Sequence, residues 1–282
     1  MITRSFIFKP EDRQYVLDHL LQQLVTDQQI TGTLLVGSTA TGFTDNFSDI
    51  DLIVVMPHAA TVTMVYDQWH QKIQDLFPVL QSYTITHDED NLTYSCLLEN
   101  YIEINITFLY LDALIATRSI WQITFDRSGK IADIMTKTWA DQSRPDSEQK
   151  YLDHIRTVWY DIMHVIIFVH REQPWRAHYH LQQLQHLTIK LAGLRYDLHI
   201  HQGRHADEIP TDIRSSFDHM LATNSQSDEI LRALRYTTTL FFEQAHALET
   251  KFGRRHAPLQ HLHNKMIAYL TIFAPPQPAN QT

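Results

Sequence analysis

The chain has 282 residues, 44% hydrophobic and 20% charged, which is typical of a globular protein large enough for two domains. Its net charge of −9 argues against a general nucleic-acid-binding protein, because neutralising phosphates requires clustered lysine and arginine. A single cysteine, Cys96, excludes an internal disulfide framework and fits a reducing compartment. The N-terminal stretch lacks an apolar segment of signal-peptide length, and no apolar run reaches the ~20 residues of a membrane span. We therefore expect a cytoplasmic protein.

The first half of the chain alternates predicted helices and strands. Apolar residues at helical spacing follow Pro10, which is a favourable first residue of a helix. In "YIEINITFLYL" (101–111), apolar residues alternate with polar ones, the pattern of a strand with one buried face. In chain order we expect a helix at 10–25, strands at 31–37 and 49–56, a helix at 61–77, strands at 79–87, 92–98 and 101–111, a short helix near 112–118 and a strand at 121–126.

The second half has an almost entirely helical pattern after the polar segment "ADQSRPDSEQ". We predict an α/β (α+β) protein: an N-terminal domain over 1–145 with a mixed sheet and flanking helices, and an all-helical bundle over 146–273. The segment 274–282, "APPQPANQT", is predicted to be a disordered tail. The predicted helices of the bundle are 147–171, 174–200, 209–222, 227–252 and 258–271.

Residues 37–51, "GSTATGFTDNFSDID", place a small polar loop before an apolar strand. Asp49 and Asp51 point the same way in an extended segment, roughly 6–7 Å apart at the backbone. Converging carboxylates repel unless a cation lies between them, and oxygen ligands suit Mg²⁺ or Mn²⁺. Gly37 lets the backbone approach closely, and Ser38 adds a hydroxyl and an N–H suited to phosphate oxygens. Either half alone also fits an ordinary surface turn, whereas the combination indicates a metal and phosphate site.

This combination resembles the signature of the nucleotidyltransferase superfamily, Gly-Ser followed by a spacer and then two acidic residues separated by one. The closer resemblance is to kanamycin nucleotidyltransferase and related aminoglycoside and lincosamide adenylyltransferases, which join an α/β half to a helical half. Those enzymes follow the motif with an acidic strand whose counterpart here is "IEIN" (102–105). A strand and helix similar to theirs follow in "ITFDRSGKIADIMTKT" (123–138).

The resemblance implies roles for residues of the N-terminal half. Asp49 and Asp51 would bind the metal ion. Glu103 would stand beside the metal as a third carboxylate or contact the acceptor; otherwise it is a solvated residue on the polar face of a strand. The residues that would contact the nucleotide are Gly37, Ser38 and Ser48.

The resemblance also points to the helical half. Asp161 falls where kanamycin-type enzymes carry a catalytic-base glutamate, so it would accept the acceptor's proton, with Glu103 as the alternative. His164, one turn later, is the histidine that we single out as an acid–base partner. Many family members carry an arginine at the position of Thr41. Two cations could substitute for it, or could be ordinary surface charges: Lys190 and Arg195.

We therefore expect a metal-dependent nucleotidyltransferase that moves a nucleoside monophosphate, AMP from ATP or its equivalent from another NTP, to a hydroxyl of a small molecule such as an aminoglycoside antibiotic. The expected cofactor is Mg²⁺ or Mn²⁺. One alternative is an enzyme that modifies protein side chains. Another is a non-catalytic nucleotide-binding module, which Thr41 favours and the aspartate pair opposes. The expected partners are a nucleotide and a small molecule, with no nucleic acid or membrane; the oligomeric state stays open, a homodimer included.

Overall fold

The computed structural model describes residues 9–45, 47–117, 119–141, 147–253 and 257–274. The chain divides into two compact units, Met1–Ser143 and Arg144–Thr282. The expected boundary near residue 145 lies outside the described residues. So does the expected tail at 274–282, except Ala274, which is buried in the apolar core of the helical unit.

A six-stranded mixed sheet forms the first unit, as the sequence predicts. The strand order is β3-β4-β5-β2-β1-β6. Strands β2 and β5 run parallel, and the other neighbouring strands are antiparallel. A parallel pair needs a crossover, which here contains helix α2 and the β3–β4 hairpin. The strands are β1 (Gly32–Val36), β2 (Ile50–Met56), β3 (Val79–Asp88), β4 (Asn91–Leu98), β5 (Glu103–Tyr110) and β6 (Trp121–Asp126).

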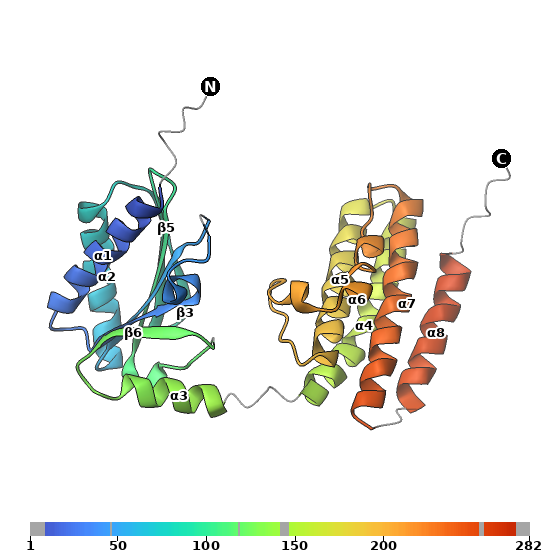
Figure 1. Cartoon of the computed structure of the whole chain (residues 1–282). Helices are drawn as coiled ribbons and strands as arrows, with labels where there is room; N and C mark the ends of the chain where they lie inside the picture. The colour runs from blue at the N-terminus through green and yellow to red at the C-terminus, as the bar shows by residue number, and fades with distance from the viewer. Residues whose placement is uncertain (1–8, 46, 118, 142–146, 254–256, 275–282) are drawn as a thin grey trace. The chain divides into compact units, whose positions relative to one another are not determined.

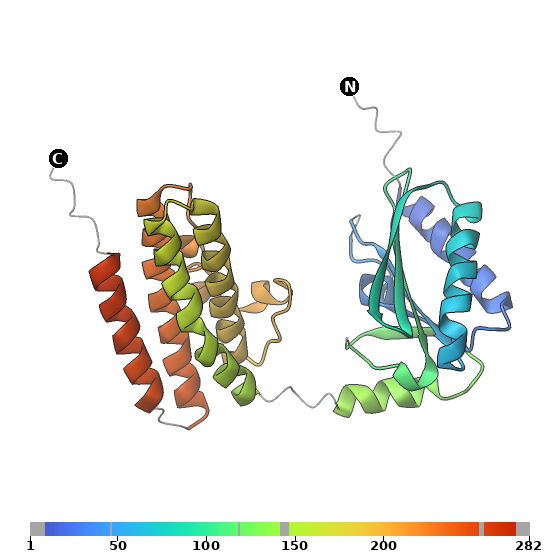
Figure 2. The same cartoon turned by 180° about the vertical axis from the view of Figure 1, so that it is seen from behind.

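Helices cover the two faces of the sheet unequally (Figure 1, Figure 2). Helices α1 (Pro10–Thr26) and α2 (Val62–Leu76) pack on one face, where they and the strands share a large apolar core. On the other face, α3 (Ile131–Asp141) packs with a smaller cluster that includes Val55 of β2. Because side chains alternate along a strand, Asp51 shares the face of Val55 but lies four residues nearer the start of β2.

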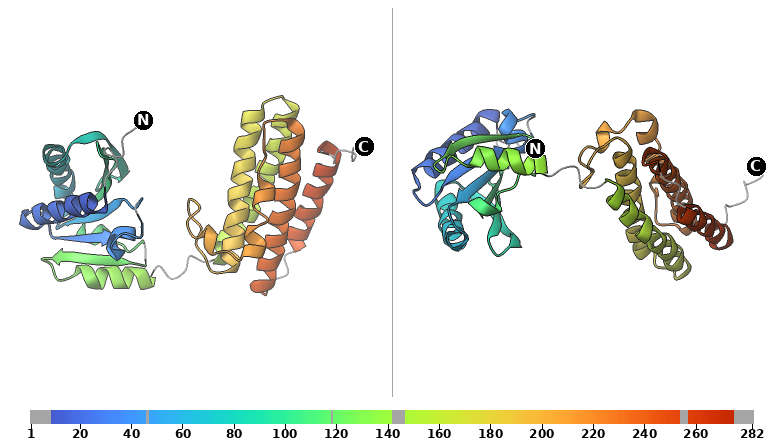
Figure 3. Two further views of the ribbon diagram at one scale, coloured as in Figure 1. Left: turned by 45° about the horizontal axis from the view of Figure 1, so that its top comes forward. Right: turned by 90° about the horizontal axis from the view of Figure 1, so that it is seen from below.

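The second unit is a bundle of long helices (Figure 3). Their apolar stripes meet in one core, which includes fully buried Val158, Leu184 and Phe241. None of the helices in the described ranges is long and apolar enough to cross a membrane. The helices are α4 (Ser147–His170), α5 (Pro174–Arg195), the short α6 (Thr211–Arg214), α7 (Ser227–Lys251) and α8 (Ala257–Phe273).

Helix α5 ends five residues before the predicted end at 200. Asp197 adopts a left-handed conformation with φ of +58°, which a continuing helix cannot accommodate. The chain then folds back, and the N–H of Leu198 donates to the carbonyl of Gly193 at 3.0 Å. Lys251 Nζ donates to the carbonyl of Arg195 at 2.9 Å and so provides a partner for a carbonyl that the end of the helix leaves without one.

Two further predicted helices are wrong. The segment 209–222 forms only α6 and a 3₁₀ turn (Asp218–Met220), because its serines compete for backbone partners; Ser215, for example, donates to the carbonyl of Asp212 at 3.0 Å. The segment near 112–118 begins as a 3₁₀ turn (Leu111–Ala113) and continues extended. Its next residues are apolar, which suggested a short helix, but their burial alternates as in an extended chain. Leu114 and Ala116 are buried, and Ile115 is exposed.

Candidate active site

The pairing of β2 with β5 brings the predicted acidic residues together at the end of the sheet where both strands begin. Asp51 lies opposite Asn105 in the parallel register, and Ile50 lies opposite Ile104. Both isoleucines are fully buried on the α1–α2 side. Their burial forces the polar residues that alternate with them onto the opposite face. The strand pattern therefore orients the carboxylates away from the main core.

Asn105 links two of the predicted carboxylates. Its Nδ2 donates to Oδ2 of Asp49 at 3.2 Å and to Oε1 of Glu103 at 3.1 Å. Ser95 of β4 donates its hydroxyl to Oδ1 of Asn105 at 2.6 Å, and Ser95 is itself buried. This bond fixes which end of the amide faces the carboxylates. The structure thus places Asp49 and Glu103 at the same amide group.

Thr39 connects the glycine–serine turn to both aspartates. Its hydroxyl donates to the carbonyl of Asp49 at 3.1 Å and accepts the N–H of Asp51 at 2.9 Å. The side chain is only 2% exposed, so water cannot easily replace these bonds. The sequence analysis did not identify Thr39, because a threonine in a polar loop carries no signal of this role.

The turn itself is a short 3₁₀ helix (Gly37–Thr41). Gly37 has φ of +63°, a conformation that glycine adopts without strain. The carbonyl of Ser38 accepts the N–H of Phe43 at 2.8 Å and the hydroxyl of Thr41 at 3.0 Å. Within the described part of the chain, the Ser38 hydroxyl has no hydrogen-bond partner, which leaves it available for a ligand. Thr41 therefore closes the turn.

Arg13 of α1 anchors the loop before the aspartates, a role that the sequence did not reveal. Its guanidinium donates to the carbonyls of Ser48 at 2.6 Å and Asp45 at 2.9 Å, and lies 4.0 Å from the ring centre of Phe43. Arg13 is only 3% exposed, and this burial lowers its pKa although Asp45 and Asp49 act in the opposite direction. The arginine therefore fixes the backbone around the motif.

Ser48, predicted to contact the nucleotide, makes hydrogen bonds within its own loop. Its hydroxyl donates to Oδ1 of Asp45 at 3.1 Å and lies 3.3 Å from the hydroxyl of Thr44. These contacts are internal to the loop. They assign the hydroxyl a structural part in the loop, and a contact between Ser48 and nucleotide stays a prediction.

The carboxylate oxygens at the start of β2 and β5 are ligands that suit a hard divalent cation. Among the described residues, no group of three or more His, Cys, Asp or Glu side chains is arranged as a ready metal cage. Mg²⁺, however, commonly takes only one or two carboxylates from the protein and completes its shell with water and substrate phosphates. Asp49 and Asp51 offer such a pair of oxygen ligands. Glu103 is exposed and tied to Asn105.

In the helical unit, Asp161 has a partner on another helix. Its Oδ1 lies 2.8 Å from Nδ1 of His180 on α5, and the two side chains are 14% and 12% exposed. His164, the partner suggested by spacing along α4, instead points Nδ1 at the carbonyl of Tyr160, 2.8 Å away. Helical spacing could not reveal His180, because it comes from a different helix. Both side chains of this pair are mostly buried, whereas His205 and Glu208 form an exposed pair.

The two candidate substitutes for a phosphate-binding arginine differ. Arg195 donates to Oε1 of Gln244 at 2.7 Å and so helps to join α5 to α7. Lys190 belongs to a group of positive charges with Lys150. Burial lowers the pKa of His154 to about 4, and the charge of Lys190 acts in the same direction. Arg195 therefore has a structural role, whereas Lys190 contributes positive charge beside His154.

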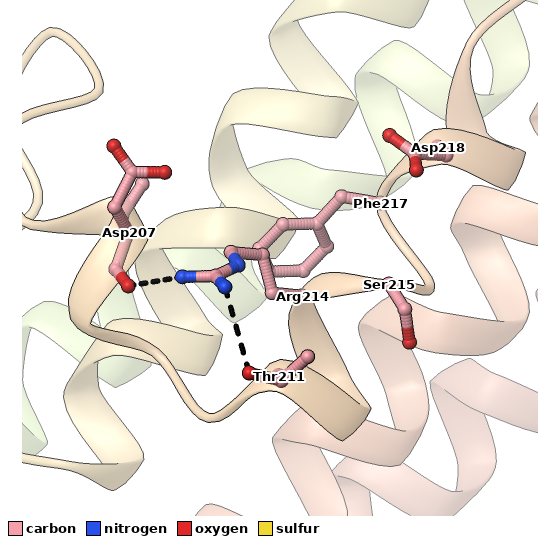
Figure 4. A pocket seen from close by; sticks show the side chains of 7 residues that line it. Asp207, Thr211, Arg214, Ser215, Phe217 and Asp218 are labelled. Atoms are coloured by element: carbon pink, nitrogen blue, oxygen red, sulfur yellow. Dashed lines mark hydrogen bonds between the residues drawn. The ribbon is translucent and has the colours of Figure 1, made fainter.

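The pockets of the described residues include one in each unit. One, of about 460 Å³, is lined by residues of the 206–218 segment, and there Arg214 donates to the carbonyl of Asp207 and to Oγ1 of Thr211 (Figure 4). These polar groups stabilise the segment itself. A second pocket, of about 270 Å³, lies between α1, β6 and the turn, and Thr39 contributes to its wall. The predicted carboxylates line neither pocket.

Comparison with known proteins gives one family match. The model of the streptomycin adenylyltransferase family matches residues 11–272. No curated protein matches the sequence. An aminoglycoside 6-adenyltransferase from Bacillus subtilis is similar in structure with a TM-score of 0.44 and 11% identity, over 93% of this chain and 98% of that chain. A nucleotidyltransferase-like protein from Exiguobacterium sibiricum has a TM-score of 0.39 and 12% identity, over 94% of this chain and 87% of that chain.

Proposed function

Because the chain belongs to the streptomycin adenylyltransferase family, and is therefore an adenylyltransferase, we propose that it transfers AMP from ATP to a hydroxyl group of an aminoglycoside-type antibiotic. The observation that carries the proposal is the arrangement at the start of β2, where Thr39 ties Asp49 and Asp51 to the glycine–serine turn. Carboxylates beside such a turn suit a nucleotide held through a divalent cation. On this proposal the sheet unit binds the nucleotide and the helical unit binds the acceptor.

Asp49 and Asp51 are the residues that would hold Mg²⁺ or Mn²⁺, and Glu103 would contribute a third carboxylate or contact the acceptor. Such an ion, when bound, neutralises charge on the α-phosphate and the departing pyrophosphate. Gly37 allows the backbone to approach the triphosphate, and Ser38 offers its hydroxyl to a phosphate oxygen. Most of the acceleration would come from this positioning and from charge complementarity.

Transfer also requires a group that accepts the proton of the attacking hydroxyl. Asp161 is the first candidate, in line with the family resemblance, and Glu103 is the alternative. The acidic protein, with a net charge of −9, suits a polycationic acceptor by long-range attraction. This charge supports an aminoglycoside over a neutral sugar as the acceptor.

The test is an AMP-transfer assay with ATP labelled at the α-phosphate, Mg²⁺, and a panel of aminoglycosides and lincosamides. We expect label in at least one antibiotic, with release of pyrophosphate. Asp49→Asn should lower the rate by more than about 10²-fold, because it removes a charged ligand. Asp67→Asn, at an exposed carboxylate of α2, is the matched control and should leave the rate unchanged.

Three results would contradict the proposal. Equal activity of the Asp49 and Asp67 variants would exclude the carboxylate site. Label that enters protein and no antibiotic would indicate a protein-modifying enzyme instead. ATP binding without pyrophosphate release for any acceptor would indicate a non-catalytic nucleotide-binding module.

A further inference from the structure

A cluster of basic side chains lies where three segments of the helical unit meet. Helices α4 and α5 are joined by residues 171–173 alone, so they run antiparallel and the end of α5 lies beside the start of α4. Lys150 and His154 are one turn apart on α4, and Lys190 lies near the end of α5. Nζ of Lys150 lies 3.1 Å from Nδ1 of His199, which follows α5. These four side chains form the basic cluster.

The members of the basic cluster act on one another through their charges. Burial lowers the pKa of Lys150, and the positive charge of Lys190 lowers it further. Burial is also the largest cause of the lowered pKa of His199, followed by the charge of Lys150, and Lys190 acts in the same direction. The pKa of His154 responds to both lysines as well. Like charges therefore converge here, which is unfavourable unless an anion lies between them.

The protein supplies little negative charge to balance the basic cluster. Within the described part of the chain, no ion pair joins any of its four members to an acidic side chain. Asp153 raises the pKa of His154, but its carboxylate is 57% exposed and pairs with Arg156 at 3.3 Å. Lys150 and Lys190 are both partly buried, unlike ordinary extended surface lysines. In a protein with a net charge of −9, such a cluster is an exception.

The polar atoms that the basic cluster offers are hydrogen-bond donors. An ammonium group can only donate, so Nδ1 of His199 accepts from Lys150, and the neutral ring carries its proton on Nε2. Lys190 and His154 have no hydrogen-bond partner among the residues that the structure describes, and each carries an N–H group to donate. A set of donors with excess positive charge suits a ligand that is negatively charged and only accepts hydrogen bonds.

We propose that the basic cluster binds a phosphate group, either as inorganic phosphate or as part of a larger molecule. The ammonium groups of Lys150 and Lys190 match the charge of a phosphate near neutral pH. The N–H groups of His154 and His199 can donate to its remaining oxygens. Binding would relieve the repulsion between the two lysines. The inference goes beyond the proposed function and is separate from it, because it requires the helical unit alone.

The first experiment is isothermal titration calorimetry of the whole protein with inorganic phosphate in magnesium-free buffer. We expect wild type to bind one phosphate per chain. Lys150→Gln and Lys190→Gln should each raise the Kd by about 10-fold or more, because each removes a charge-assisted hydrogen bond. Lys265→Gln, at an exposed lysine of α8, is the matched control and should bind as wild type does.

Titration with AMP under the same conditions distinguishes the two sources of the phosphate. A lower Kd for AMP than for inorganic phosphate would indicate that the site takes the phosphate of a larger molecule. Equal values would indicate that it recognises the phosphate group alone. In either case the two lysine variants should weaken binding of AMP and of inorganic phosphate by the same factor, since both ligands present the same group.

Thermal unfolding gives an independent measurement. Phosphate should raise the Tm of wild type relative to chloride at the same ionic strength, because a ligand that binds the folded state stabilises it. Lys190→Gln should lose most of this increase. Without phosphate, the same variant should unfold at the wild-type temperature or above, because it removes repulsion from Lys150. A lysine that only supported the fold would instead lower the Tm when replaced.

Four results would overturn the inference. The first is a wild type that binds no phosphate. The second is binding that both lysine variants retain, and the third is an equal loss in Lys265→Gln, which would reflect overall charge. The fourth is binding that requires Mg²⁺ and disappears in Asp49→Asn, which would place the phosphate in the sheet unit. Failure of AMP transfer would overturn the proposed function and would leave these binding results unchanged.

Discussion

Nδ2 of Asn105 lies 3.2 Å from Oδ2 of Asp49, and this hydrogen bond joins β5 to the residue that precedes β2. The same amide group serves Glu103 at 3.1 Å. Two carboxylates can therefore approach one another because a neutral donor lies between them, before any cation arrives. Ser95, behind the amide, keeps its donor end toward the acids.

Replacing Asn105 with alanine should lower kcat/KM for AMP transfer by about 10–100-fold, the usual effect of losing a residue that orients metal ligands. Ser95→Ala should have a smaller effect, since the amide remains and loses only its orienting donor. Steady-state assays at several Mg²⁺ concentrations would measure both, with circular dichroism to confirm the fold. Full activity of the Asn105 variant would show that the amide does not position the carboxylates.

Thr39→Val should disturb the motif while keeping the shape of the side chain. The variant leaves the N–H of Asp51 without its buried acceptor, which costs about 1–3 kcal/mol in the free energy of unfolding. AMP transfer should also fall, because the aspartate backbone loses its tie to the turn. Thr41→Val is the control, because that residue is exposed and its loss should stay within about 0.5 kcal/mol. Urea unfolding of both variants decides the matter; equal stabilities would refute the prediction.

Arg13→Met should destabilise the sheet unit by about 2–4 kcal/mol, since hydrogen bonds from a buried charged donor contribute more than neutral ones. Methionine keeps the apolar stem but cannot donate to the carbonyls of Ser48 and Asp45. Arg156→Met offers a contrast, because the ion pair of Arg156 with Asp153 is exposed to solvent, and its loss should cost about 0–1 kcal/mol. Denaturant midpoints give the comparison, and similar losses in the two variants would contradict the anchoring role.

The stability of the helical unit should depend on pH through His154. Burial lowers its pKa to about 4, whereas an unfolded histidine titrates near ~6.5. Between these values the unfolded chain binds the extra proton, so stability increases from pH 4 to 6.5 and is lost as the pH falls through that window. After allowance for solvent screening, the change is at most about 2 kcal/mol.

Unfolding of wild type and His154→Gln at pH 4.5, 5.5 and 7 would measure this dependence. The variant should show a flatter profile over the same range. His186→Gln, at an exposed histidine of α5, should keep the wild-type slope. A variant at position 154 with the wild-type slope would assign the dependence to other groups.

Most of the fold follows from the sequence where local and tertiary preferences agree. The alternation in β5 and the long apolar stripes of α4 and α7 predict those elements to within two residues at each end. The 209–222 segment shows where this reasoning fails. Its apolar residues recur at helical spacing, but they are divided between α6 and a separate 3₁₀ turn. Packing against residues distant in sequence overrides the local preference for a helix.

The same limit applies to the site. The sequence singles out Asp49 and Asp51, because two like charges beside a buried strand are chemically unusual, and the family resemblance adds Glu103; their role in the site stays a prediction. The parallel pairing of β2 with β5 brings Asn105 beside these carboxylates. Sequence spacing does not determine how two strands align, so this contact could not be predicted. Arg13 and His180 were missed for a related reason, since each meets its partner across at least 19 residues.

The principal apolar cores of the two units have no residue in common. A substitution that loosens the bundle need not disturb the packing beneath the carboxylates, and the reverse also holds. On the proposed function, natural selection could therefore vary the helices, and with them the choice of acceptor, while the strands that would hold the nucleotide are retained. Such modularity is what a resistance enzyme needs when the drugs it meets change faster than the nucleotide it consumes.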